Sequence, residues 1–234
     1  MNAIELYRAG QLADAIQALS AELRDNPADA KRRTFLFELL CFAGDYDRAG
    51  KQLDVLAQGG PQTEMGTLVY RAAIEAERQR HELFRAKSFP EPGAEPAAPA
   101  GTLNGKPFQS VEDADPRIGG RLEVFAAGNY VWVPFAHIAS IQVSPPKKLR
   151  DLLWIPAMVR LGPGMKGQDL GQVLLPVLSP FSWLHADDAV RLGRQTVWAE
   201  QEEGEVVPFG QKQLLVDDEE CPFLEVREIQ FGGA

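Results

Sequence analysis

The chain has 234 residues, an ordinary apolar content of 45% and a formal net charge of −9. This length is enough for one or two domains with hydrophobic cores of their own, and the excess of negative charge disfavours binding to the phosphate backbone of nucleic acids. The sequence has no apolar run of about 18 residues and no basic, apolar export signal in MNAIELYRAG, and its two widely spaced cysteines fit a reducing compartment, so we expect a cytoplasmic protein that does not enter the membrane.

The first 88 residues contain a motif that recurs after 34 positions. LYRAGQLADA (6–15) and LCFAGDYDRA (40–49) share Leu, Ala, Gly and Ala at matching positions, and Pro27 and Pro61 are separated by the same interval. A period of 34 residues is that of the tetratricopeptide unit, a pair of helices joined by a turn. Each proline is expected at the first turn of the helix that follows it. The expected helices span residues 2–9, 12–25, 28–43, 46–58 and 62–87.

Helical repeats of this kind depend on their neighbours for stability. One repeat cannot bury its own apolar face, so the final helix, a second domain or a partner must cover what remains exposed. Phe35, Leu39 and Phe42, on the first helix of the second repeat, are candidates for a partner-binding face, with intramolecular core as the alternative. Cys41 is expected to be buried, and His81, within the charged stretch EAERQRHELFRAK, is expected to be solvated.

The composition changes after this helical region. FPEPGAEPAAPAG, at residues 89–101, has four prolines and neither a helical nor a strand period, which predicts an extended linker. We therefore divide the chain into a helical domain (1–88), a Pro/Ala-rich linker (89–102) and a second domain (103–234).

The second domain is predicted to be rich in β-strands. RLEVFAA and NYVWVPF are expected to form a hairpin with Gly128-Asn129 in the turn, and IASIQV, QVLLPVL and QLLVD are further strand candidates. LRDLLW reads as a short helix before a strand at Ile155, and DDAVRLGRQ as a short helix ending at Gly193, after which TVWAEQEE returns to the sheet. Strands with few helices between them predict a mostly antiparallel sheet or small barrel. The expected fold class is α+β, a helical repeat domain followed by a β-rich domain with short helices.

One segment places groups of possible catalytic use close together. SWLHADD contains Ser182, His185, Asp187 and Asp188. A hydrolytic site requires such groups to converge in space, which neighbours in sequence seldom do, and a metal site requires more ligands. Capping of the helix near Ala189 by Asp187 or Asp188 is therefore favoured.

A glycine-containing loop, LGPGMKGQDLG, resembles a phosphate-binding loop in part. Gly162 and Gly167 have the required gap, but Gln168 and Asp169 stand where Lys and Ser/Thr are needed. The sequence therefore predicts no catalytic residues, no cofactor and no metal.

Three local motifs are not obviously required by core packing: DPRIGG (115–120), LRDLLW (149–154) and RLGRQTVW (191–198). Trp and Arg are enriched among residues that dominate protein–protein contacts. The alternative is that the tryptophans belong to the core and the arginines bind carbonyl groups. The partner-binding candidates from these motifs are Arg150, Asp151, Trp154, Arg194 and Trp198. A clustered basic face around Lys147, Lys148 and Arg150 would be needed to revive nucleic-acid binding.

These features together resemble a known family. The helical repeat of residues 3–57, the stretch DPRIGGRLEVFAAGNYVWVPFAHIASIQVSPPKKLRDLLWIPA, and then LPVLSP and LGRQTVW are similar, in this order, to ImpE-type proteins, also called TagJ or SciE. The resemblance implies a cytoplasmic, non-enzymatic accessory protein of type VI secretion, a contractile apparatus that injects effectors into neighbouring cells. It also implies a link to the small subunit of the contractile sheath and, through it, to the AAA+ ATPase that recycles the sheath.

Two hypotheses of function follow. The first is a binding adaptor that holds an amphipathic helix of the sheath small subunit on apolar surface. The second is a small hydrolase or nucleotide-dependent enzyme in which His185 works with Asp187 or Asp188, and it requires those side chains to converge in a pocket with a nucleophile or metal. The oligomeric state is left open.

Overall fold

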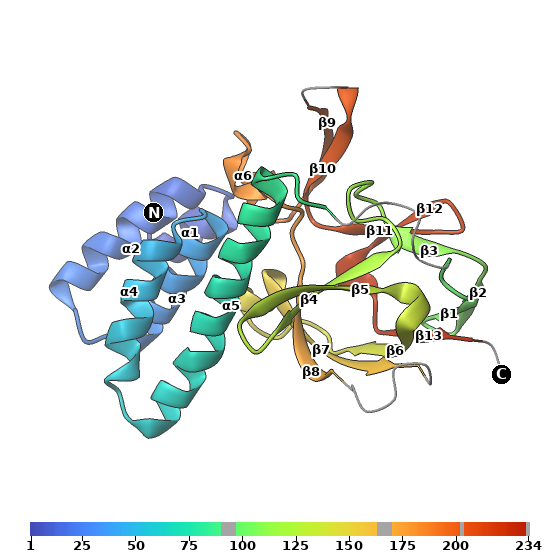
Figure 1. The fold of residues 1–234 in the computed structure, drawn as a ribbon. Helices are drawn as coiled ribbons and strands as arrows, with labels where there is room; N and C mark the ends of the chain where they lie inside the picture. The colour runs from blue at the N-terminus through green and yellow to red at the C-terminus, as the bar shows by residue number, and fades with distance from the viewer. Residues whose placement is uncertain (90–96, 163–169, 202–203, 233–234) are drawn as a thin grey trace.

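The computed structural model describes residues 1–89, 97–162, 170–201 and 204–232, and consists of a helical half followed by a β-rich half (Figure 1). The α1–α2 and α3–α4 pairs form two successive helical hairpins, and α5 follows as a long final helix. The predicted α+β class with an N-terminal tetratricopeptide-like region is therefore confirmed. The helices are α1 (Ala3–Arg8), α2 (Leu12–Asp25), α3 (Ala30–Phe42), α4 (Tyr46–Ala57) and α5 (Pro61–Arg85).

The repeated small residues explain the geometry of the two hairpins. Gly10 and Gly44 follow the first helix of each pair with φ of +79° and +71°, a left-handed conformation that glycine adopts without a steric penalty. Ala15 and Ala49 are fully buried, because the helices approach closely at these positions. The sequence period therefore corresponds to a real structural repeat.

The two prolines of the repeat behave differently. Pro61 is the first residue of α5, as predicted. The prediction for Pro27 was wrong, because α3 begins only at Ala30. Asp29 provides the cap instead, with its side chain accepting a hydrogen bond from the backbone N–H of Arg32 (3.0 Å).

The described part of the β-rich half contains three antiparallel sheets. The largest has eight strands in the order β2-β1-β13-β6-β7-β8-β4-β5, and the smaller ones have the orders β12-β11-β3 and β10-β9. The two end strands of the eight-stranded sheet, β2 and β5, are not paired with each other, so this sheet is open and the small-barrel alternative is excluded. The strands are β1 (Gly101–Leu103), β2 (Lys106–Phe108), β3 (Val111–Asp113), β4 (Arg121–Ala126), β5 (Asn129–Pro134), β6 (Ile138–Val143), β7 (Trp154–Leu161), β8 (Gly171–Pro176), β9 (Thr196–Glu200), β10 (Val206–Gly210), β11 (Gln213–Val216), β12 (Glu219–Pro222) and β13 (Glu228–Phe231).

All five strand candidates are confirmed, with two corrections nearby. The β4–β5 hairpin turns at Ala127 and Gly128, both with positive φ, one residue earlier than predicted. Among the described strands, β9 pairs only with β10 and not with the large sheet, and this hairpin projects from the body of the molecule (Figure 1). Short helical segments occur where expected, at η2 (Leu149–Leu152) and α6 (Asp188–Arg191), and η4 (Ser182–Leu184) is a further short helical segment that was not predicted.

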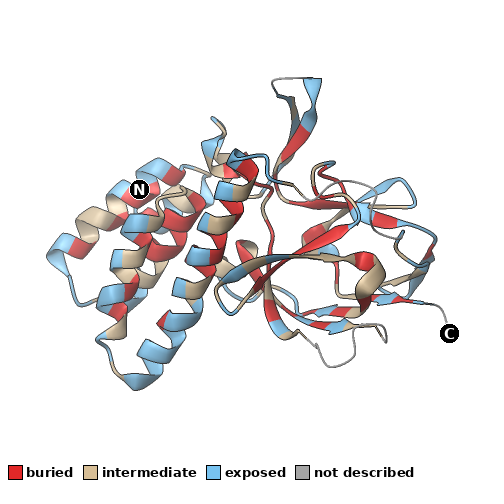
Figure 2. Cartoon of the chain, viewed as in Figure 1, coloured by how far each residue is buried: buried red, intermediate tan, exposed pale blue. Residues whose placement is uncertain are grey.

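The helical half covers part of one face of the large sheet, at strands β4, β5, β7 and β8. Along β4, Phe125 packs into the core of the helices, whereas Leu122 and Val124 belong to a second core on the other face. The same alternation separates Trp154 from Ile155 at the start of β7. Figure 2 shows buried positions concentrated where α5 faces the sheet and along the strands. The β-rich half therefore covers much of the apolar surface that two repeats leave exposed. The boundaries of the helical domain, the linker and the second domain stay a prediction.

Candidate functional site

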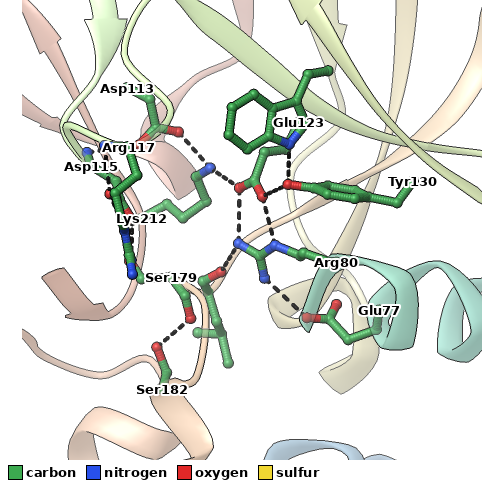
Figure 3. Close-up of polar contacts among 12 residues, drawn as sticks. Glu77, Arg80, Asp113, Asp115, Arg117, Glu123, Tyr130, Ser179, Ser182 and Lys212 are labelled. Atoms are coloured by element: carbon green, nitrogen blue, oxygen red, sulfur yellow. Dashed lines mark hydrogen bonds and ion pairs between the residues drawn. The ribbon is translucent and has the colours of Figure 1, made fainter. Parts of the chain in front are cut away.

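A fully buried ionic network joins the two halves of the chain (Figure 3). Arg80 of α5 is 1% exposed and donates from Nε and Nη2 to the two carboxylate oxygens of Glu123 on β4, at 2.7 and 2.8 Å. Its Nη1 donates to Glu77 on the preceding turn (3.0 Å), and Nη2 also donates to the carbonyl of Leu178 (2.9 Å). This fork geometry uses the planar guanidinium fully.

Lys212 extends the network to a third part of the chain. Its buried Nζ contacts Glu123 and lies 2.5 Å from Asp113 on β3. Burial alone would raise the pKa of Glu123, but Arg80 and Lys212 together lower it to about 2. Burial raises the pKa of Asp113 to about 6; the carboxylates of Glu123 and Asp115 add to this rise, and the single cation beside it, Lys212, only partly opposes it. The network therefore holds Glu123 firmly ionised and Asp113 only weakly so.

His81 lies beside this network, and the prediction that it is solvated was wrong. It is 6% exposed, stacks on Phe181 with ring centroids 5.0 Å apart, and places Nε2 3.3 Å from Glu77. Burial lowers its pKa to about 4 despite that carboxylate. The other oxygen of Glu77 accepts a hydrogen bond from Trp154 Nε1 (2.9 Å). Two of the charged residues in EAERQRHELFRAK, Glu77 and Arg80, thus bind the sheet instead of forming a solvated helix face.

The network is a structural junction without space for a substrate. The cavity beside it encloses about 20 Å³, which is room for about one water molecule. Its charged atoms are committed to one another, as Figure 3 shows for Arg80, Glu123 and Lys212. Buried charges are stable only when paired in this way.

Two of the arginines singled out from the sequence also join the halves. Arg150 donates to Glu38 of α3 (3.0 Å) and lies over the ring of Tyr70 of α5, 4.6 Å from its centroid. Arg194 donates to the backbone carbonyls of Tyr7 and Arg8 at 2.7 and 3.0 Å. This is the carbonyl-binding role that was the alternative to partner binding.

The remaining motif residues have different environments. Asp151 accepts hydrogen bonds from the backbone N–H groups of Lys147 and Lys148, at 2.8 and 2.9 Å, at the start of η2. Trp154 is buried in the interface core, whereas Trp198 is 39% exposed on the projecting β9–β10 hairpin. Of these two tryptophans, only Trp198 presents surface to a partner.

The repeat-helix candidates divide in the same way. Leu39 and Phe42 are buried to 0% and 1% exposure in the helical core, so in this structure they fill the intramolecular role. Phe35 is only half buried and packs edge-on against Tyr7, with ring centroids 5.6 Å apart.

The SWLHADD segment does not form a catalytic constellation among the described residues. Asp187 caps α6 by accepting from the Ala189 N–H (2.8 Å), as predicted, and Asp188 accepts from the backbone N–H of Leu12 (2.7 Å). His185 Nδ1 accepts from the backbone N–H of Asp187 (3.0 Å), and the Ser182 hydroxyl donates to the Ser179 carbonyl (2.6 Å). Within the described ranges no three His, Cys, Asp or Glu side chains are grouped to hold a metal. Most of LGPGMKGQDLG falls at 163–169, outside the described residues.

A larger hollow lies between the repeat helices and the segment before η2. We call it the α1–α3 groove; it encloses about 860 Å³. The apolar residues of its lining include Tyr7, Phe35 and Leu152, and Ile4, which also lines it, is 52% exposed. The residues that line it are Asn2, Ala3, Ile4, Tyr7, Arg8, Leu19, Glu22, Asp29, Lys31, Arg32, Phe35, Pro146, Lys147, Lys148, Leu149 and Leu152.

Sequence reasoning located only one apolar residue of this groove, Phe35. Ile4 and Tyr7 are three positions apart and therefore share a face of α1, but a six-residue helix is too short to show a period. Leu149 and Leu152 also have the spacing of one helical turn within LRDLLW, and this spacing could have indicated a shared apolar face. The groove forms where the repeat helices meet the segment before η2, and contact between segments so distant in the chain leaves no pattern in the local sequence.

Comparisons with known proteins agree with this architecture. Residues 6–71 match the model of the tetratricopeptide repeat, and residues 105–230, which include all three local motifs, match the model of the ImpE protein. The chain belongs to the ImpE family. The predicted family resemblance is therefore confirmed.

Two known proteins are similar to nearly the whole chain. The chain is 34% identical to the type VI secretion system accessory component TagJ of Pseudomonas aeruginosa, over 99% of this chain and 91% of that protein. It has the same fold as a Vibrio parahaemolyticus protein of known crystal structure, with a TM-score of 0.84 at 22% identity, covering 99% of this chain and 98% of the other. No helix in the described part of the chain is long and apolar enough to cross a bilayer.

Proposed function

We propose that this ImpE-family chain is a non-enzymatic accessory component of type VI secretion and works as a cytoplasmic adaptor that binds a helix of another protein. The observation that supports the proposal is the α1–α3 groove, because it is large, has apolar residues in its lining and is bordered by helices. Such grooves receive the apolar face of an amphipathic helix through residues spaced three and four positions apart. The name of the Pseudomonas aeruginosa relative supports the secretion context.

The proposed occupant is the N-terminal helix of the small subunit of the contractile sheath. A helix with its side chains is about 10 Å across. Large apolar side chains from one turn of such a helix would pack against Ile4 and Phe35, which are both partly exposed in the groove. Through this contact the adaptor would stand beside the sheath while the AAA+ ATPase recycles it. The partner-binding candidates are thereby revised to groove residues, with Phe35 retained and Leu39 and Phe42 assigned to the core.

Titration of the full chain with a fluorescent peptide of that sheath helix tests the proposal. We expect a dissociation constant in the micromolar range or lower at modest salt, and we expect Ile4→Gln to weaken binding by about tenfold, since truncation of a contact near the centre of an interface costs more than 1 kcal/mol. Met65→Gln is the matched control, because Met65 is also exposed (67%) but lies on α5 outside the groove. Absence of micromolar binding, or equal weakening by both variants, would refute the assignment.

A further inference from the structure

The α1–α3 groove has more basic than acidic side chains, although the chain as a whole is acidic. Its lining contains five basic residues and two acidic ones, against a net charge of −9 for the protein. Both acidic residues, Glu22 and Asp29, are bound to the same Arg32, at 2.8 and 2.6 Å. Arg32 offsets only one of these two negative charges, so with the other four cations the lining keeps a net charge of +3.

Those other cations are exposed and come from three separate elements. Arg8 ends α1, Lys31 lies in the first turn of α3, and Lys147 and Lys148 precede η2. None of the four makes a salt bridge to a carboxylate among the described residues. Asp151, the nearest carboxylate in sequence to the two lysines, accepts from their backbone N–H groups. Exposed lysines of this kind present their charge to whatever enters the groove.

We propose that the groove recognises an amphipathic helix whose polar flank is acidic. This inference rests on the proposed function, in that it takes the occupant to be a helix, and it specifies the chemistry of that helix. An apolar stripe would meet Tyr7, Phe35, Leu149 and Leu152, while Asp or Glu side chains bordering the stripe would meet the lysines. Such rim charges determine the choice of partner and the rate of association more than the total affinity.

A single-stranded nucleic acid is the other class of ligand that combines negative charge with flat apolar groups. The groove favours the helix for two reasons. The rings of Tyr7 and Phe35 pack edge to face against each other at 90° and so do not form a row of open stacking platforms. The acidic chain as a whole repels a long phosphate backbone.

The experiment compares two forms of the sheath-helix peptide on the full chain by fluorescence anisotropy. One form is native, and in the other every Asp and Glu is replaced by Asn or Gln. We expect the native peptide to bind about tenfold more tightly at about 50 mM salt, and this advantage to shrink at about 500 mM, because exposed charge pairs are weak individually and are screened by salt. Lys147→Glu combined with Lys148→Glu should abolish the advantage. Lys106→Glu is the matched control, since Lys106 is an exposed lysine on β2, outside the groove.

The outcomes separate the two proposals. If both peptides bind equally, or if the lysine reversal has no effect while circular dichroism shows an intact fold, the acidic-flank inference is overturned and the adaptor function stands. If neither peptide binds, both proposals fall together. Competition by oligo(dT) or oligo(U) at the same lysines would also overturn the inference, in favour of a nucleic-acid ligand.

Discussion

Replacement of Gly44 by alanine tests how the two halves of the chain fit together. A Cβ at Gly44 would lie 2.4 Å from Cδ2 and 2.6 Å from Cε3 of Trp183, a residue of η4 in the β-rich half. These separations are about 1 Å shorter than an ordinary carbon–carbon contact, so the indole ring must move. Gly10 occupies the equivalent position in the first repeat with a similar φ, and its added Cβ would meet only Arg194 Nη1, at 3.6 Å.

The pair of variants separates backbone strain from the clash. Both alanines suffer the left-handed backbone conformation, at about 1–2 kcal/mol, whereas only Gly44→Ala also overpacks the interface, at about 1–3 kcal/mol. We therefore expect Gly44→Ala to lower the free energy of unfolding by about 2–5 kcal/mol and Gly10→Ala by about 1–2 kcal/mol.

Urea denaturation followed by both circular dichroism and tryptophan fluorescence measures these differences. Adding Trp183→Ala should remove the clash, so the Gly44 substitution should then cost no more than Gly10→Ala. Equal losses for the two single variants, within about 0.5 kcal/mol, would show that Trp183 does not pack against Gly44 and would refute this account of the interface.

Two further predictions concern the buried network. The unfolded chain protonates His81 near its ordinary pKa of 6.5 and the folded chain only near 4, so stability should fall by about 2 kcal/mol between about pH 7 and pH 4.5. His81→Phe should remove this part of the pH dependence. The opposite contribution of Asp113 should remain, because its raised pKa favours folding as the pH falls. If the variant and the original chain show the same dependence of stability on pH, His81 is not the group responsible. Glu123→Gln leaves Arg80 and Lys212 buried with one carboxylate fewer, and urea denaturation should show a loss of about 3–5 kcal/mol. A loss below about 1 kcal/mol would mean that the network is more hydrated than its burial indicates.

The helical half was predictable because its order comes from local, repeated signals. The glycines at 10 and 44 and the alanines at 15 and 49 fix hairpin geometry through conformation and size, properties that can be read from single residues. The end of α2 and the start of α3 were less predictable, because Pro27 is compatible with both a turn and a first helical turn. Asp29 decided between them through its capping hydrogen bond.

The β-rich half was predictable in its longer strands and not in its shorter ones. β4 to β6 each have six residues, enough to show β-type composition, whereas β1, β2 and β3 have three. A three-residue strand such as Lys106–Phe108 is too short for an alternating pattern, and pairing with distant segments defines it.

The joining residues were visible in the sequence but were interpreted wrongly. Glu77, Arg80, His81 and Phe84 follow the i, i+3, i+4, i+7 spacing of one buried helix face. Because three of them are polar, the pattern indicated a solvated face instead of a contact. Only the positions of their partners, Glu123 among them, show that the charges are paired.

The wide separation of the network's members along the chain affects the protein during its synthesis. Arg80 leaves the ribosome 43 residues before Glu123, which itself precedes Lys212 by 89 residues. At a translation rate of about 5–20 residues per second, the guanidinium waits on the order of ten seconds for its last neighbour. During that interval the nascent helices lack the complete β-rich half against which they pack. Fragments that end before residue 212 should therefore be recognised by chaperones and proteases. Only chains that include the C-terminal strands should then accumulate as stable protein.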